Sequence, residues 1–386
     1  MFEVYALLFV VTLLAVISET YTDRVLNSNG ITVSTDIRGK ICLFVAIAIL
    51  IWFAGTRTRM NDTFTYIISF KSRIPSGIAS LGQIKWELGA NPLFFVYQVL
   101  IKTFVSNNPH VFILITSGIV VYSMVKFLYR NSWNFGESIY FFLTFTVYGF
   151  TMAAIKQTMA TAIAIWIIPC IQEKKYIKML FILTIAIHIH PYVVILIVAV
   201  IIYDKGLWNK YIYTIIIATF LIGITFSSFT EIIFRLTELI GQDYEENWDI
   251  ASTGVSVARV LAYTIVPGLS LLFRDEIEEL NNPLFDLSIN MSIVAMCLSI
   301  ISWFGGAVLF GRLPAYFGIF ICIALPYILQ LANRKYGNIL SLFIFAAFLY
   351  YYMTYYTKFF NGYGVGLWDS VYNRVSLLSI LMGESL

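Results

Sequence analysis

The chain has 386 residues, of which 59% are hydrophobic and 12% are charged, and its formal net charge is +3. An average soluble domain is about 25% charged, so this composition excludes a soluble fold, and the small net charge gives no indication of nucleic-acid binding. The apolar runs are continuous, as in 177–202 and 341–353, and do not alternate as the strands of a β-barrel do. We therefore predict an all-α polytopic bundle of membrane helices.

Hydropathy predicts about 11–13 membrane spans within a single integral membrane domain that covers residues 1–386. The first apolar run follows Glu3 rather than a basic segment, so we expect a retained span and not a signal peptide. The spans are expected near 2–18, 41–55, 111–128, 137–153, 157–172, 178–190, 191–203, 210–228, 257–273, 286–304, 313–331 and 337–355. The shorter segment 93–105 after Pro92 is expected to be an interfacial or re-entrant helix inside an outer loop, 56–110.

The distribution of Lys and Arg predicts the sidedness of the spans, because short cytoplasmic loops are enriched in basic residues. With both chain termini outside, the short basic loops all fall on the cytoplasmic side. They carry Arg24, Arg38, Lys40, Lys126, Arg130, Lys174, Lys175, Lys178, Lys205, Lys210, Arg274, Arg334 and Lys335. The outer face then carries two longer segments, 56–110 and 229–256. The second begins with an amphipathic pattern, which is typical of a helix lying on a membrane.

Two aromatic-rich stretches combine rings with polar groups, as sugar-binding surfaces do. Residues 242–249 add amide and acidic side chains to their rings, but this composition also describes an ordinary interfacial loop. The C-terminal stretch 351–372 is rich in tyrosine. An interfacial aromatic belt accounts for most of these tyrosines, and we expect others to line a groove for glycan.

Residues 177–202 form either one tilted span or a hairpin of two short spans. Pro191 disfavours helical geometry at His190 and removes a backbone donor. Basic residues on both flanks also favour a hairpin. We predict the hairpin, because a single span would place Arg312 on the cytoplasmic side.

Four cationic residues lie at the edges of apolar runs: Arg57, Lys156, His190 and Arg312. A charge held against hydrocarbon costs roughly 2.5–3.5 kcal/mol on insertion scales, so such residues usually mark a site. In the predicted topology, Lys156, His190 and Arg312 each precede a helix that runs inward from the outer face. Helix N-termini favour phosphate, which predicts a trap for a lipid-borne pyrophosphate. The alternative for each residue is a side chain that only reaches the lipid headgroups.

Candidate proton acceptors lie beside these cations. His188 and His190 flank Ile189, and imidazole titrates near neutrality. Asp62 follows Arg57 and Arg59, so it either orients an arginine or accepts a proton from a sugar hydroxyl. For the histidines a hydrogen bond inside the bundle, and for Asp62 a surface ion pair, are the alternatives. The three histidines and four cysteines lack metal-ligand spacing, so no metal or cofactor is expected.

The order of five short motifs resembles the EpsG-type proteins, which are similar to Wzy-type polymerases of bacterial capsule and exopolysaccharide. The motifs are Arg57-Thr58-Arg59-Met60-Asn61-Asp62-Thr63 with Tyr66, then Trp86-Glu87-Leu88-Gly89 with Pro92-Leu93-Phe94, then Lys156-Gln157 with Ala160, then His188-Ile189-His190-Pro191, and Gly311-Arg312 with Tyr316-Phe317. The similarity extends from about residue 40 to 330. Each motif alone is weakly specific, and their order and spacing carry the resemblance.

This resemblance implies a GT-C-like membrane glycosyltransferase that joins undecaprenyl-pyrophosphate-linked oligosaccharide repeats on the outer face of a bacterial cytoplasmic membrane. It implies neither metal nor nucleotide sugar, and it implies a flippase and a chain-length regulator as functional partners. The catalytic residues are expected to be Asp62, Glu87, His190 and Arg312. The residues expected to bind substrate or pyrophosphate are Arg57, Arg59, Tyr66, Lys156, Gln157, His188 and Tyr316.

The chain departs from the family pattern at two positions. Lys156 stands where arginine is commoner, which removes bidentate phosphate recognition. Pro191 stands where serine or alanine is more familiar, which leaves His188 and His190 as competing equivalents, and we favour His190. Two other functions fit a cationic membrane bundle, namely a flippase for lipid-linked oligosaccharide and a transferase resembling O-antigen ligase. A flippase should show an internal repeat, which the sequence lacks.

Overall fold

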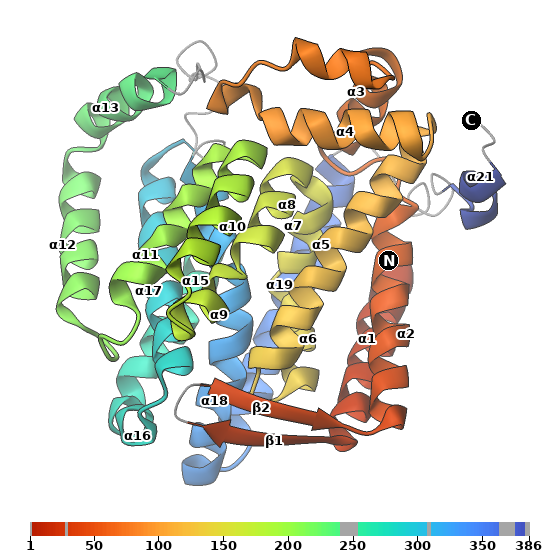
Figure 1. Ribbon diagram of the computed structural model, residues 1–386. Coiled ribbons are helices and arrows are strands. Elements are labelled where there is room, and N and C mark those ends of the chain that lie inside the picture. The colour runs from red at the N-terminus through yellow and green to blue at the C-terminus, as the bar shows by residue number, and fades with distance from the viewer. Residues whose placement is uncertain (1, 28–29, 240–253, 307–309, 363–374, 383–386) are drawn as a thin grey trace.

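The computed structural model describes residues 2–27, 30–239, 254–306, 310–362 and 375–382 (Figure 1). The N-terminal part contains α1 (Phe2–Thr20), β1 (Thr22–Asn27), β2 (Gly30–Thr35), α2 (Ile37–Gly55), α3 (Thr63–Ser72), η1 (Ile78–Gln83), η2 (Leu88–Ala90), α4 (Pro92–Phe104) and α5 (Pro109–Asn131), where η denotes a 3-10 helix. The middle part contains α6 (Phe135–Thr144), α7 (Val147–Ala153), α8 (Ile155–Ala164), α9 (Ile167–Gln172), α10 (Tyr176–Ile189), η3 (Pro191–Ile197), α11 (Val198–Ile202), α12 (Lys210–Ile224) and α13 (Phe226–Leu239). The last part contains α15 (Val257–Leu272), α16 (Arg274–Leu280), α17 (Pro283–Phe304), η4 (Phe310–Phe317), α18 (Gly318–Tyr336), α19 (Ile339–Gly362) and α21 (Leu377–Met382).

The predicted all-α membrane bundle is confirmed, with fewer full-length spans than expected. Among the described residues, seven helices are long and apolar enough to cross a membrane, or up to nine if each bent pair is one span. The prediction of 11–13 spans was too high because it included apolar segments that fold as short or broken helices. The predicted span 137–153, for example, is divided between α6 and α7 by Thr146, whose φ is +64°. Broken helices are tolerated at membrane depth where protein surrounds them, and both halves of this one are largely buried.

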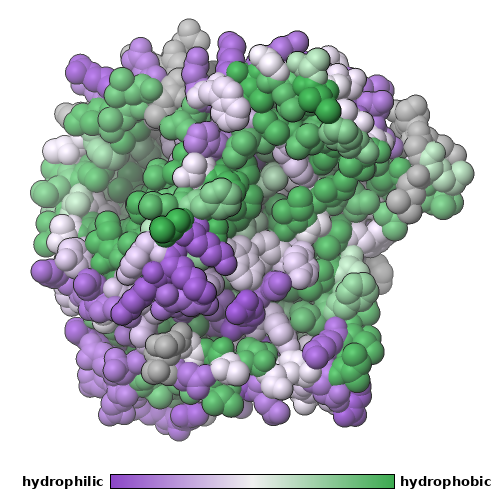
Figure 2. Space-filling model, in the orientation of Figure 1, coloured by the Kyte–Doolittle hydropathy of each residue, from purple (hydrophilic) through white to green (hydrophobic). Residues whose placement is uncertain are grey.

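The helices form an inner and an outer set. In α18 with the preceding η4, 89% of the apolar window is buried, and in α17 83% is buried, so these helices form the centre. For α1, α2 and α19 the values are 28–33%, which leaves most of each helix to face lipid. Figure 2 shows the resulting belt of apolar side chains between a hydrophilic upper rim and a hydrophilic lower part.

The predicted break within 177–202 is present, but the helices on its two sides are shorter than the candidate spans. His190 adopts extended geometry, with φ −157° and ψ 110°, and Pro191 is the first residue of η3. As a result η3 packs against α10, and α11 continues from η3 (Figure 1). The break places His190 at the same end of the bundle as the beginning of α8 and η4.

The loops at the lower end of the bundle in Figure 1 are tied to one another. Asn282 at the start of α17 donates to the carbonyl of Asn27, at 3.0 Å, and Asn290 donates to that of Gly206, at 2.9 Å. Lys335 pairs with Glu276 at 2.5 Å. The basic loops that were predicted to share one side of the membrane therefore do lie at one end of the molecule.

One of these loops contains a structure that the sequence analysis missed. Residues between α1 and α2 were predicted as a plain loop, but β1 and β2 pair as an antiparallel hairpin. Arg24 of β1 pairs with Glu19 at 2.6 Å and donates to the Tyr129 and Ser132 carbonyls, at 2.7 and 3.0 Å. The hairpin is thus attached to the connection between α5 and α6.

The opposite end is covered by helices that lie across the bundle (Figure 1). The helix predicted at 93–105, as interfacial or re-entrant, is present as α4, and α3 lies near it. Lys102 of α4 donates to the carbonyls of Phe70 and Ile74, both at 2.6 Å, which fastens the C-terminal end of α3. α13 bends by 107° from α12. The predicted sugar-like residues 242–249 and the C-terminal stretch 363–372 lie outside the described residues, apart from the tyrosines of α19.

Candidate functional site

A tight turn between α2 and α3 places Asp62. Met60 and Asn61 have φ values of +125° and +47°, a conformation that must be held by other contacts. Asn61 donates to the Ala153 carbonyl at 3.0 Å, and Thr63 donates to the Met152 carbonyl at 3.3 Å. These bonds attach the turn to the end of α7, immediately before α8 begins with Ile155 and Lys156.

Arg57 supports this turn from inside the protein. Its side chain is buried, and its guanidinium donates to the Thr63 hydroxyl at 3.0 Å, to the Ser117 hydroxyl at 2.9 Å and to the Ala54 carbonyl. These contacts join α2, α3 and α5. The structure therefore places Arg57 as a residue that positions the turn.

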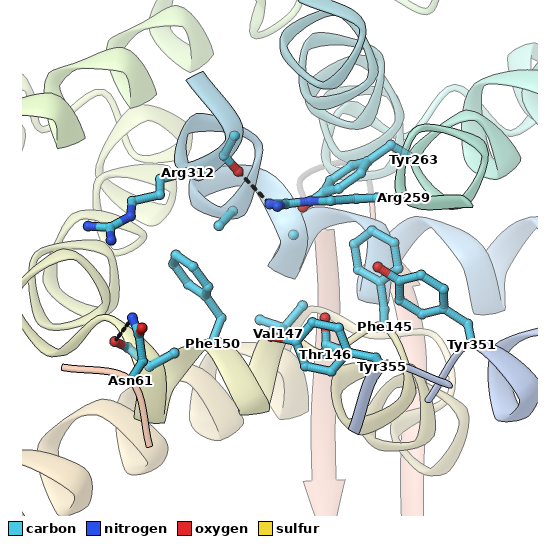
Figure 3. Close-up of a pocket in the computed structure, with 14 residues that line it drawn as sticks. Asn61, Phe145, Thr146, Val147, Phe150, Arg259, Tyr263, Arg312, Tyr351 and Tyr355 are labelled. Atoms are coloured by element: carbon cyan, nitrogen blue, oxygen red, sulfur yellow. Dashed lines mark hydrogen bonds between the residues drawn. The ribbon is translucent and has the colours of Figure 1, made fainter. Parts of the chain in front are cut away.

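Lys156 and Arg312 are brought together by a contact between α8 and η4. Gln157, buried beside Lys156, donates to the Arg312 backbone carbonyl at 2.7 Å. Lys156 lies in the first turn of α8, and Arg312 precedes α18. The preceding carbonyl, that of Gly311, accepts from Arg259 of α15 (Figure 3). Two consecutive carbonyls of η4 are thus held, which fixes the backbone at Arg312.

Five residues form what we call the polar cluster: Asp62, Tyr66, Lys156, His190 and Arg312. Asp62 interacts electrostatically with Arg312 and Lys156, and both cations interact with His190. The Tyr66 hydroxyl lies against the Lys156 backbone amide. In the described part of the chain, neither cation forms a direct ion pair with Asp62. Both cations therefore retain donors for a ligand.

Burial and the nearby positive charges have opposite effects on the protonation of Asp62. Burial raises the pKa of its carboxyl above the usual value, and the positive charges of Arg312 and Lys156 act in the opposite direction. A carboxyl with a raised pKa is a better proton acceptor near neutral pH than an ordinary aspartate.

His190 stands beside Tyr316 at the break between α10 and η3. The two ring centroids are 6.4 Å apart, and the ring of Tyr192 lies 5.4 Å from that of His190 on another side. The His190 Nδ1 atom is buried and has no hydrogen-bond partner among the described residues. Leaving a buried polar atom without a hydrogen bond costs free energy, so a ligand that forms a hydrogen bond with this nitrogen would be stabilised.

A cavity of about 270 Å³ extends from the polar cluster into the bundle (Figure 3). Asn61 and Arg312 line the end next to the cluster. The other end is lined by aromatic rings and by a cation that the sequence analysis did not select: Phe145, Arg259, Tyr263, Tyr351 and Tyr355. Arg259 could have been found by the rule that selected Lys156, because it lies in the first turn of a helix that begins with a long apolar run.

Some predicted site residues lie apart from this cavity. Arg59 and Glu87 are exposed, and neither lines the cavity. The Nδ1 atom of His188 contacts the Thr184 carbonyl one turn back in its own helix, at 2.8 Å. Of the two histidines it is therefore His190 that joins the polar cluster. Among the described residues, no group of three His, Cys, Asp or Glu side chains is arranged to hold a metal ion.

The chain was also compared with known proteins. No curated protein and no solved structure matches it. A family model matches residues 40–372, which is most of the chain, and its description is the EpsG family. The matched range contains the polar cluster and the whole cavity lining. The chain therefore belongs to the EpsG family, a family of Wzy-type polysaccharide polymerases.

Proposed function

We propose that this chain is a glycosyltransferase that polymerises undecaprenyl-pyrophosphate-linked oligosaccharide repeats at the outer face of a bacterial cytoplasmic membrane. Family membership supports a polysaccharide polymerase. The observation that supports the lipid-diphosphate substrate is the polar cluster, in which Lys156 and Arg312 face a single carboxylate. Two cations in a membrane bundle that form no ion pair among the described residues favour an anionic ligand.

The proposed reaction is a displacement at the anomeric carbon of the donor glycan. A hydroxyl oxygen of the incoming repeat forms the new bond to that carbon, and the bond from the carbon to the lipid diphosphate breaks. The diphosphate leaves with the bonding electron pair. Lys156 and Arg312 stabilise its developing negative charge, which is the largest electrostatic demand of such a step.

The hydroxyl proton passes to Asp62 in this mechanism. Its raised pKa supports the role of proton acceptor, and the adjacent cations keep a fraction of it ionised. In this mechanism the His190 Nδ1 atom, which has no hydrogen-bond partner among the described residues, holds the acceptor hydroxyl or a phosphate oxygen. Tyr66 and Gln157 position Lys156 and Arg312 through backbone contacts, and Arg57 positions Asp62 through the turn.

The outward orientation rests on the two ends of the bundle. The end that carries the β hairpin also carries the short basic loops, and short basic loops are retained in the cytoplasm. The polar cluster takes its residues from α3 and the turn before it, the beginning of α8, the break after α10, and η4, and α3 lies at the opposite end (Figure 1). In this orientation the site faces outward, where a flippase delivers the repeats and a chain-length regulator acts on the product.

Purified protein in lipid nanodiscs with a lipid-diphosphate-linked repeat tests the proposal. We expect a ladder of products together with one released lipid diphosphate per bond formed. Arg38→Ala, a change at the opposite end of the bundle, is the matched control for Arg312→Ala, which should lose the ladder. A single transfer without a ladder would indicate a ligase, and transfer of lipid between leaflets without bond formation would indicate a flippase.

A further inference from the structure

The cavity described above has two chemically different ends. Arg312 and Asn61 belong to the end that meets the polar cluster, whereas the far end combines Arg259 with aromatic rings (Figure 3). Arg312 interacts with Asp62, Lys156 and His190. Arg259 interacts instead with Tyr263 and Tyr351. The far end is therefore a separate subsite with its own positive charge.

The rings of the far end are arranged around a space that suits one sugar. Phe145 and Tyr263 meet edge to face at 4.8 Å, and Tyr351 is stacked between Phe145, at 6.5 Å, and Tyr355, at 6.4 Å. Ring faces contact the C–H faces of sugars, and tyrosine hydroxyls bond their edges. The whole cavity, at about 270 Å³, is smaller than the usual pocket for a drug-sized ligand. It therefore has room for a monosaccharide.

Arg259 adds a charge that a neutral sugar does not require. Its guanidinium is half-buried and donates to the Gly311 carbonyl, and no carboxylate among the described residues pairs with it. Arginine has five N–H donors, so donors remain for a ligand. Arg259 also lies in the first turn of α15, where the helix dipole disfavours a cation. An anion bound at this position would offset both unfavourable features.

We propose that the ring-lined half of this cavity binds a monosaccharide that carries an anionic group, such as a uronic acid, and that Arg259 binds that group. The diphosphate of the lipid is the other possible source of an anion. The aromatic lining and the separation of Arg259 from the polar cluster favour the sugar. The inference rests on the proposed function, because it assigns the substrate class of the same site.

Two lipid-diphosphate-linked disaccharides that differ in one group test the inference. One carries a uronic acid, and the other carries the same sugar with its carboxylate reduced to an alcohol. We expect wild-type protein to use the acidic substrate with a kcat/KM about tenfold to a hundredfold higher, the range for one charge-assisted hydrogen bond. Arg259→Gln should bring the ratio between the two substrates close to one, and Arg259→Lys should keep part of it.

The ratio separates recognition of the sugar from other roles of Arg259. Loss of the Gly311 contact alone, or of a contact to the diphosphate, would lower both rates by the same factor and leave the ratio unchanged. That result would overturn the inference. Arg38→Gln makes the same substitution at the opposite end of the bundle, so it is the matched control and should keep the wild-type ratio.

A binding measurement keeps the inference separate from the polymerase activity. Methyl glucuronide and methyl glucoside are added to the purified protein, and saturation-transfer NMR compares their signals. We expect the glucuronide signal to exceed the glucoside signal in the wild type and to fall in Arg259→Gln. Equal signals in the wild type would overturn the inference even if the ladder forms. Preferential glucuronide binding without any bond formation would instead count against the proposed polymerase.

Discussion

At the scale of single residues, two positive charges of the polar cluster occupy positions that folding alone does not favour. Lys156 lies in the first turn of α8 and Arg312 lies in the first turn of η4, which leads into α18, and the helix dipole is repulsive to cations at such positions. Neither forms a direct ion pair with Asp62 among the described residues. A diphosphate bound between them would gain from both charges and from the helix N-termini.

Arg312 is the residue whose loss should affect the reaction most. Removing one donor to a developing anion costs about 2.7–4 kcal/mol of barrier, which is a factor of about 10²–10³ in kcat. We therefore expect Arg312→Ala to abolish polymer in cells while the protein still reaches the membrane. Polymer size on gels and immunoblots of membrane fractions provide the measurement. Polymer of normal amount and length in this variant would remove Arg312 from the mechanism.

The pH dependence of the reaction should report on Asp62. Burial raises the pKa of Asp62. As the pH falls, its carboxylate is therefore protonated at a higher pH than that of an ordinary aspartate. We expect kcat/KM to decline on the acidic side at that pH. Lys156→Gln removes one of the two charges that oppose the rise, so the acidic limb of its residual activity should move to higher pH. An acidic limb that stays in place in this variant would exclude Asp62 as the proton acceptor.

The sequence predicted most of the polar cluster but not Arg259 at the far end of the cavity, although Tyr351 and Tyr355 of that end belong to the stretch in which groove-lining tyrosines were expected. Asp62, Lys156, His190 and Arg312 could be selected because charge at the edge of an apolar run is unusual and because the motifs resemble those of a family. Arg259 belongs to none of those motifs. The far end depends on α15 meeting α19, which is a tertiary contact between segments that no local pattern relates.

At the scale of elements, the turn from 56 to 63 determines where the residues of a short sequence motif lie. Its backbone is held in left-handed conformations at Met60 and Asn61. The contacts that hold it come from Arg57 on one side and from the carbonyls of α7 on the other. Thr63 takes part in both sets, because its hydroxyl accepts from Arg57 and donates to Met152.

Thr63→Val should therefore destabilise the protein. The substitution leaves the buried Arg57 guanidinium and the Met152 carbonyl each without one bond, at a cost of about 1–3 kcal/mol. Thermal unfolding in detergent should show a lower midpoint. Thr65→Val is the matched control, because Thr65 is exposed on the same helix. Equal midpoints for the two variants would show that the turn is held by other contacts.

The features that the sequence predicted best are those that follow from the covalent structure of a single residue. Proline prevents α10 from continuing, so the break at His190 could be foreseen. The β hairpin could not be placed by hydropathy, because its strands alternate partly buried and exposed residues and contain no long apolar run. The break at Thr146 is also a tertiary effect. The residues on both sides of Thr146 are apolar, and a broken helix is tolerated there only because protein surrounds it.

At the scale of the whole molecule, the two ends of the bundle differ in chemistry. One end holds the β hairpin and the short basic loops, and the other holds α3 and α4 (Figure 1), with the polar cluster at α3. Since basic loops stay in the cytoplasm, the molecule has a predicted direction in the membrane. The apolar belt of Figure 2 lies between these ends.

Cysteine labelling of intact cells measures this direction. Arg59 and Lys205 are exposed and lie at opposite ends, so Arg59→Cys should react with an impermeant maleimide from outside and Lys205→Cys should not. Cys170, Cys297 and Cys322 are buried and Cys42 is half-buried, so wild-type protein is the background control. The opposite labelling pattern would place the polar cluster in the cytoplasm.

The most direct measurement is a cryo-electron microscopy structure of the protein with undecaprenyl diphosphate bound in a nanodisc. The account predicts phosphate oxygens within hydrogen-bond distance of the Lys156 ammonium and the Arg312 guanidinium, with the lipid chain leaving the bundle sideways. Density for the diphosphate at the basic loops of the other end, with both side chains unoccupied, would contradict it.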